Sequence, residues 1–127
     1  MPQEDFGLIS VIMAAYNAEK TIEQAVNSVL NQTYPNFELL VVNDHSTDRT
    51  MELVESIAAK DRRVHLISNS KNCGVSHTRR HGLDRAEGLW IAILDSDDLW
   101  APEKLEKQIN LQRKTNADLL FTGSAFI

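Results

Sequence analysis

Short, continuously apolar runs recur along this chain, and polar segments with helical periodicity separate them. A strand buried on both faces of a parallel sheet is apolar throughout, whereas a strand with one solvated face alternates apolar and polar residues. The alternation of such runs with helical segments predicts an α/β domain: a mostly parallel sheet flanked by helices and joined by right-handed crossovers. The expected strands are residues 8–15, 37–42, 64–68, 89–94 and, beginning a fifth strand, 118–122.

The segments between these runs are expected to be helices. One apolar face in the first segment consists of Ile22, Ala25, Val26, Val29 and Leu30, and this helix should end near Gln32, before the turn formers TYPN. The HSTD stretch offers caps for a second helix, whose apolar stripe is Leu53, Val54, Ile57 and Ala58. Two more helices are expected, one over residues 75–86 with Gly88 just past its end, and one from Pro102 to about Lys114.

The length and net charge of the chain limit the number of domains and the classes of function it can have. The 127 residues make one domain, with residues 1–6 as a loose tail and residues 7–127 as one folded unit. A net charge of −5 argues against a nucleic-acid groove. No segment has the length of uninterrupted apolar residues expected of a membrane span, and MPQEDFG lacks the basic start and apolar core expected of a signal peptide. The single cysteine, Cys73, fits a reducing cytoplasm. Because the chain stops on the strand-like LLFTGSAFI, we expect a fragment of a longer protein.

Polar residues follow three of the expected strands directly. In open α/β sheets, ligands bind outside the carboxyl ends of the strands, and the carboxyl ends of parallel strands lie along one edge. We therefore expect segments far apart in sequence to converge on one cleft at this edge, namely Tyr16 and Asn17, Asn43 and Asp44, and Asp95, Ser96 and Asp97.

The stretch AILDSDDLW places Asp95, Asp97 and Asp98 directly after an apolar run, and their charges repel one another. Carboxylate oxygens are the ligands that Mg²⁺ and Mn²⁺ prefer. A metal held there can clamp a diphosphate and absorb the negative charge of a leaving group. The alternative is a solvated acidic loop that caps the following helix.

Four segments together resemble the nucleotide-binding half of a family 2 glycosyltransferase. They are SVIMAAYN, SVLNQTYPNFELLVVNDHSTDRT, NCGVSHTRRHGL and AILDSDDLWAPEKL, and they cover nearly the whole chain. The resemblance implies a Rossmann-like GT-A fold and a nucleotide-diphospho-sugar donor, with a UDP-sugar as the first expectation. It also implies a divalent metal, Mn²⁺ or Mg²⁺, and inverting transfer of one sugar to an acceptor hydroxyl.

The resemblance also implies roles for five residues. Tyr16 would lie against the nucleobase, and Asp44 would hydrogen-bond that base. Arg79 would lie near the nucleotide, Asp95 near the ribose, and Asp97 would ligate the metal that bridges the diphosphate. From the residues alone, a packed aromatic, a helix cap and a solvated helix face remain alternatives for the first three.

Several positions depart from the family pattern. Ala14 replaces a frequent proline, and Asn43 and His45 replace the more usual Asp and Gly. With His45 the turn lacks the glycine that adopts positive φ most easily, although histidine tolerates positive φ better than most residues. Asp98 follows the metal motif and is expected to cap the helix that begins near Pro102.

The general base of an inverting transfer takes the proton of the attacking hydroxyl. In the resembled family it is an acidic residue well downstream, so we expect it beyond Ile127 and expect this chain alone to transfer sugar poorly. The acceptor would be a saccharide or a lipid-linked sugar, in cell-surface polysaccharide or glycolipid synthesis. The full-length protein would be cytoplasmic, or peripheral at the inner face of the membrane.

Other functions fit the residues less well. A nucleotidyltransferase usually has a Gly-rich, basic loop after the first strand, and AAYNAEK is neither. A phospho-receiver domain needs an acidic pair directly after the first strand, where this chain has AAYN. His77 and His81 have the helical spacing of a shared metal, but no third ligand is evident. A non-catalytic nucleotide-binding module remains an alternative.

Overall fold

The computed structural model describes residues 6–116, in which four strands and four helices alternate. The elements are β1 (Ile9–Ala15), α1 (Ile22–Leu30), β2 (Phe37–Asn43), α2 (Thr50–Ala58), β3 (Val64–Ser68), α3 (Val75–Arg85), β4 (Trp90–Ile93) and α4 (Lys104–Thr115). The sheet has the order β3-β2-β1-β4, and every pair of neighbours is parallel. The predicted α/β fold is confirmed, while the expected strand at residues 118–122 lies outside the described residues.

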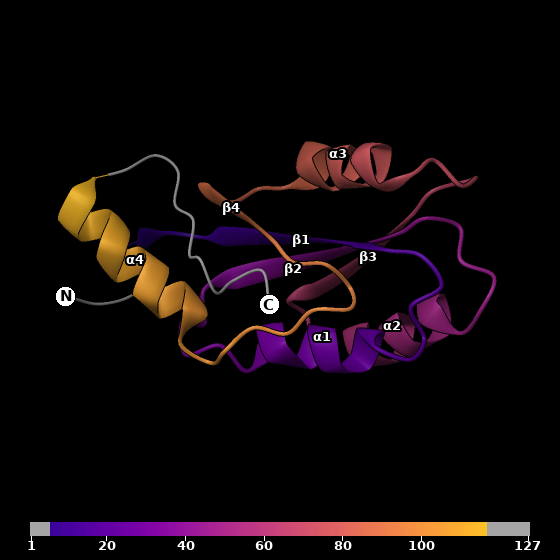
Figure 1. Cartoon of the computed structure of the whole chain (residues 1–127), viewed down its shortest axis with the longest axis horizontal. Helices are drawn as coiled ribbons and strands as arrows, with labels where there is room; N and C mark the ends of the chain where they lie inside the picture. Colours follow the sequence, from indigo (N-terminus) through magenta and orange to yellow (C-terminus); the bar gives the residue numbers. More distant parts are fainter. Residues whose placement is uncertain (1–5, 117–127) are drawn as a thin grey trace.

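The helices cover the sheet unequally. α1 and α2 lie on one face and α3 lies on the other, while α4 lies toward the end at which β1 begins (Figure 1). The larger core fills the α1–α2 side, where residues such as Val11, Leu39 and Val26 are fully buried. Under α3 lies a second, smaller core, made by Ile12, Leu40, Val42 and Ile67. Burying one such side chain stabilises a fold by about 1.5–3 kcal/mol, so both faces contribute to holding the sheet.

β4 corrects one expectation. Its continuously apolar sequence predicted a strand buried on both faces, but β4 is an edge strand of the described sheet and pairs with β1 only. Trp90 and Ala92 pack against the larger core, whereas Ile91 and Ile93 are 45% and 48% exposed. An apolar run does not reveal whether a strand has one neighbour or two, so the pattern alone could not place β4.

Gln32, the predicted end of the first helix, anchors α4. Its Nε2 donates to the carbonyl of Ala101 at 2.7 Å, and its Oε1 accepts a hydrogen bond from the Leu105 amide at 3.0 Å. α4 begins at Lys104, so Pro102 lies in the preceding turn. The expected cap by Asp98 is wrong, because the residue before the helix is Glu103 and the helix has no side-chain cap.

Gly88 lies where the chain passes close to β1. Its amide donates to Ser10 Oγ at 2.8 Å, and Ser10 Oγ in turn donates to the buried Glu38 carboxylate at 2.6 Å. A Cβ atom at Gly88 would lie 2.6 Å from Ser10 Oγ and 2.8 Å from the carbonyl oxygen of Leu8. The glycine just past α3 is therefore explained by close backbone approach and not by a left-handed cap.

We expect Gly88→Ala to lower the free energy of unfolding by about 2–3 kcal/mol, because β1 cannot move away from the added methyl group. Urea denaturation followed by circular dichroism measures this change. Ser76→Ala, at an exposed position of α3, is the control and should change stability by less than about 0.5 kcal/mol. Equal midpoints for Gly88→Ala and the wild type would contradict this role.

Candidate functional site

The loops that follow β1 and β2 are joined by hydrogen bonds. The Asn17 amide donates to Ser46 Oγ at 3.0 Å, and Asn17 Oδ1 accepts from the Thr47 amide at 2.8 Å. The Ala18 amide donates to Thr50 Oγ1 at 2.8 Å. Asn17 has a φ of 48°, a left-handed conformation that asparagine tolerates better than most residues. The two loops therefore form one connected edge at the carboxyl ends of their strands.

Tyr16 lies in the loop after β1, and the acidic loop after β4 contacts the same loop just before α1 begins. Tyr16 is 51% exposed, so its ring is not packed in the core. Thr21, which precedes α1, donates from Oγ1 to the carbonyl of Ser96 at 2.9 Å. That bond ties the acidic loop to the loop after β1, as the parallel topology predicted.

Asp44 is only 4% exposed and accepts three hydrogen bonds. Its Oδ1 accepts from the Cys73 amide at 2.7 Å and from Asn69 Nδ2 at 2.9 Å, and its Oδ2 accepts from the Gly74 amide at 3.0 Å. Burial alone would raise the pKa of Asp44, but these hydrogen bonds outweigh it and hold the pKa below its ordinary value. Asp44 is thus an ionised acceptor at the start of α3. It does not cap α2, the alternative that the sequence left open, because the N-cap residue of α2 is Arg49.

Asp95, Asp97 and Asp98 form the acidic cluster. One carboxylate oxygen from each lies within 4.8 Å of the others, and Asp95 and Asp97 are exposed. Burial, and then the charges of Asp97 and Asp95, raise the pKa of Asp98. Such crowding of oxygen ligands suits a hard divalent cation, so the residues present fit Mg²⁺ or Mn²⁺.

Arg79 connects α3 to this cluster. Its Nη2 donates to Asp95 Oδ1 at 2.6 Å in an ion pair whose side chains are 36% and 50% exposed. Its Nε is buried and has no hydrogen-bond partner among the described residues. Arg79 therefore lies at the site. The alternative interpretation, in which Arg79 belongs to a freely solvated helix face, is wrong.

The loop from Asn43 to Thr50 is shaped by its own side chains. His45 has a φ of 59°, so histidine occupies the left-handed position for which the family more often uses glycine. Asn43 is buried, and its Oδ1 accepts from the Ser46 amide at 3.1 Å. Asp48 Oδ1 accepts from the amide of Thr50, the first residue of α2, at 2.9 Å. The expected cap from HSTD is not at the N-cap position, however, because that residue is Arg49 and it makes no side-chain cap.

Asp44 and Asp48 make the stability of the fold depend on pH. Burial opposes the ionisation of Asp48 too, but hydrogen bonds from Thr50 and Glu19 hold its pKa below the ordinary 3.8. Because both carboxyls have a lower pKa folded than unfolded, their stabilisation is complete above 3.8 and is lost as the pH falls through the lowered values. We expect the urea midpoint to fall steeply below about pH 4, and less steeply in Asp48→Asn. Midpoints that stay constant down to about pH 3 would contradict this origin.

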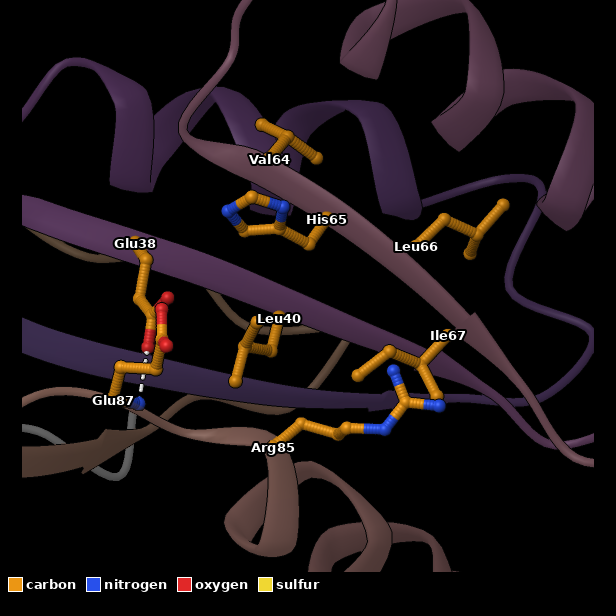
Figure 2. Close-up of a pocket in the computed structure, with 8 residues that line it drawn as sticks. All are labelled: Glu38, Leu40, Val64, His65, Leu66, Ile67, Arg85 and Glu87. Carbon is orange, nitrogen blue, oxygen red and sulfur yellow. Dashed lines mark hydrogen bonds between the residues drawn. The ribbon is translucent and has the colours of Figure 1, made fainter.

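A groove of about 430 Å³ lies elsewhere, over β2 and β3 near the end of α3 (Figure 2). Glu38, Leu40, Val64, His65, Leu66, Ile67, Arg85 and Glu87 line it. Glu38 Oε2 accepts a hydrogen bond there from the Glu87 amide at 2.8 Å. None of the predicted site residues lines this groove, so it is separate from the edge that carries Asp44 and the acidic cluster.

Sequence reasoning missed the hydrogen-bonded group that Asn69, Thr78 and His81 form beside Asp44, where His81 contacts Asn69 and not Asp44 itself. Asn69 Nδ2 donates to Thr78 Oγ1 as well as to Asp44, and Asn69 Oδ1 lies 2.8 Å from His81 Nδ1. Each of these residues has an ordinary sequence setting, and only the approach of β3, α3 and β2 brings them together. Thr78 and His81 lie in the segment NCGVSHTRRHGL, but the resemblance of that segment pointed to Arg79 and gave these two residues no role.

Comparison with known proteins is consistent with this geometry. The family model described as "Glycosyl transferase family 2" matches residues 10–126. A relative from Escherichia coli, named UDP-Glc:alpha-D-GlcNAc-diphosphoundecaprenol beta-1,3-glucosyltransferase WfgD, is 44% identical over 114 residues, which are 90% of this chain and 44% of the relative. The chain spans about half the length of the curated relatives it matches. In two further relatives, the matched residues make up 46% and 48% of the relative's own length.

Two solved structures resemble the fold. Staphylococcus aureus TarS 1-349 in complex with UDP-GlcNAc has a TM-score of 0.81 and 34% identity, over 87% of this chain and 32% of TarS 1-349. The mannosyltransferase PcManGT from Pyrobaculum calidifontis, in complex with GDP-Man and Mn²⁺, has a TM-score of 0.78 and 28% identity, over 84% of this chain and 32% of its own. Within residues 6–116, no helix combines the length and apolar character needed to cross a membrane.

Proposed function

This chain belongs to glycosyl transferase family 2, and from that premise we propose that it binds the nucleotide-diphospho-sugar donor of a glycosyltransferase. The observation that carries the proposal is the convergence of Asp44, Arg79 and the acidic cluster on one edge of the sheet. A buried ionised acceptor, an arginine paired with Asp95 and a group of crowded carboxylates suit the base, the ribose and the metal of such a donor complex.

Each side chain has a distinct part in this proposal. Tyr16 offers an exposed ring on which a nucleobase can stack, and Asp44 accepts a hydrogen bond from the base. Asp95 lies near the ribose, held by Arg79, and Asp97 is the metal ligand. When bound, the divalent metal neutralises charge on the diphosphate leaving group.

The proposed reaction is an inverting transfer. The oxygen of an acceptor hydroxyl forms a bond to the anomeric carbon, the bond from that carbon to the diphosphate breaks, and the hydroxyl proton passes to a general base. We assign no described residue as that base. The described residues bind the donor, orient its anomeric carbon and hold the metal that stabilises the leaving nucleoside diphosphate.

The named relatives support the kinds of donor and acceptor. TarS was solved with UDP-GlcNAc, and PcManGT with GDP-Man and Mn²⁺. The name of the E. coli relative specifies UDP-Glc as donor and a lipid diphosphate sugar as acceptor. We therefore infer a UDP-sugar as the first donor to test, with Mn²⁺ or Mg²⁺. The acceptor we infer is a saccharide or lipid-linked sugar in surface polysaccharide or glycolipid synthesis, reached from the cytoplasmic face of the membrane.

Calorimetric titration of the chain with UDP, GDP and dTDP, in Mn²⁺ and in a chelator, tests donor binding. We expect one of the three to bind clearly best and to bind at least about tenfold more tightly with Mn²⁺, because a divalent cation held by the acidic cluster would offset the negative charge of the diphosphate. CDP is a suitable comparison, because its base offers no ring N–H to a carboxylate acceptor. The absence of any metal-dependent binding would contradict the proposed function.

A further inference from the structure

We propose that His81 and Asn69 are positioning residues that hold the Asp44 carboxylate in the orientation in which it accepts a hydrogen bond from the nucleobase. The inference rests on the proposed function, since it concerns the base-binding part of that site. It adds two residues that do not themselves touch the nucleotide. Three contacts carry it: His81 to Asn69, Asn69 to Asp44, and Asn69 to Thr78.

The direction of each hydrogen bond follows from its partners. The Asp44 carboxylate is ionised and only accepts, so the group of Asn69 that faces it must be the N–H₂ group. Thr78 donates its own proton to the Gly74 carbonyl at 2.6 Å, so it too accepts from Asn69 Nδ2, at 3.0 Å. Both amide protons of Asn69 are thereby used, and its carbonyl oxygen faces His81.

His81 must then be the donor in its contact with Asn69. The distance from His81 Nδ1 to Asn69 Oδ1 is 2.8 Å, and an amide oxygen only accepts. The imidazole therefore carries a proton on Nδ1, whether the ring is neutral or cationic. If the Asn69 amide rotated by half a turn, its oxygen would face the Asp44 carboxylate, and His81 opposes that rotation.

The consequence for Asp44 is a fixed acceptor. Asn69 and the Cys73 amide donate to Oδ1, and the Gly74 amide donates to Oδ2. The Thr78 hydroxyl also lies close enough to this carboxylate to help lower its pKa, although its proton is directed at the Gly74 carbonyl in the hydrogen bond described above. A carboxylate oxygen accepts two hydrogen bonds, so Oδ2 keeps one direction for an N–H of the base. Fixing the carboxylate in advance removes the cost of ordering it when the nucleotide binds.

Substitutions at His81 test this role by the position of the donor atom. Asn places its Nδ2 where His places Nδ1, so His81→Asn should restore the hydrogen bond to Asn69. Leu has the shape of Asn without a donor, and Gln places its donor one atom too far. His77→Leu, one turn earlier at an exposed position of α3, is the control for replacing a histidine of this helix by leucine.

The first readout compares a ligand that has a base with one that lacks it. In Mn²⁺, we expect His81→Leu and His81→Gln to bind UDP about tenfold more weakly than the wild type, and His81→Asn to bind it normally. Inorganic pyrophosphate, which has no base, should bind all four proteins equally. Equal weakening of UDP and pyrophosphate, or a failure of His81→Asn to rescue, would show a general disturbance and overturn the inference.

The second readout needs no ligand. Titration of the Asp44 carboxyl by ¹³C NMR should show its pKa higher in His81→Leu than in the wild type, and unchanged in His81→Asn and His77→Leu. If the wild type bound no nucleoside diphosphate, the proposed function would fail, while this titration would still decide the positioning network. An Asp44 pKa and a UDP affinity that are both unaffected by His81→Leu would overturn it.

Discussion

Asp97→Asn is expected to remove the Mn²⁺ dependence of UDP binding without changing the fold. Asp97 is exposed, so exchanging one carboxylate oxygen for an amide nitrogen leaves packing unaffected. The acidic cluster loses one of its three carboxylate charges, and the neutral amide oxygen that remains at position 97 is a weaker ligand for Mn²⁺ or Mg²⁺ than a carboxylate oxygen. UDP affinity in Mn²⁺ should fall at least about tenfold, to the value that the wild type shows in a chelator.

Calorimetry with UDP, in Mn²⁺ and in chelator, measures both values for each protein. Asp84→Asn is the matched control, because Asp84 is an exposed carboxylate on α3 outside the acidic cluster. Its UDP affinity should remain that of the wild type in both conditions. The assignment of Asp97 fails if Asp97→Asn retains the full gain from Mn²⁺.

Asp44→Ala is expected to destabilise the fold by about 3 kcal/mol, because it removes one acceptor from three donors at a buried position. Two of the donors are the backbone amides of Cys73 and Gly74, which directly precede α3, and the third is Asn69. Without the Asp44 carboxylate, the loop from β3 to α3 loses three hydrogen bonds to the end of β2 and keeps those from the Asn69 amide to the Asn43 carbonyl and from Asn72 Nδ2 to the Asp44 carbonyl. The measurement is urea denaturation at pH 7.

Asp84→Ala, again at an exposed position of α3, controls for the removal of a carboxylate and should change stability by less than about 0.5 kcal/mol. Asp44→Ala should also lose UDP binding, because the base loses its acceptor. A loss of stability under about 1 kcal/mol would mean that water replaces these hydrogen bonds, and Asp44 would then not organise the loop.

The strand and helix pattern was predictable because burial on both faces leaves a strong signature in a parallel sheet. The predicted strand at residues 64–68 coincides with β3, and the predicted α3 differs from the structure only at its last residue. β4 was misjudged because its apolar run reflects packing on one side and partial exposure on the other. Asp98 was misjudged because α4 starts at Lys104, beyond the turn that contains Pro102.

At the site, strand ends were predictable and side-chain contacts were not. The topology alone brings Asp44 and Asp95 to one edge, because parallel strands have their carboxyl ends there. The contact between Arg79 and Asp95 needs the register of α3 on the sheet, which sequence periodicity does not give. The same holds for His81 and Asn69, whose hydrogen bond joins α3 to the loop after β3.

The central claim is that a metal and a nucleotide bind together at the carboxyl edge of this sheet. Mn²⁺ is paramagnetic and broadens the amide signals of nearby residues, so NMR of the chain with UDP and a small amount of Mn²⁺ locates the ion directly. We predict the strongest broadening at Asp95, Ser96 and Asp97, dependent on UDP, with the groove residues Glu38 and Glu87 little affected. Broadening centred on another acidic surface, or none at all, would contradict the claim.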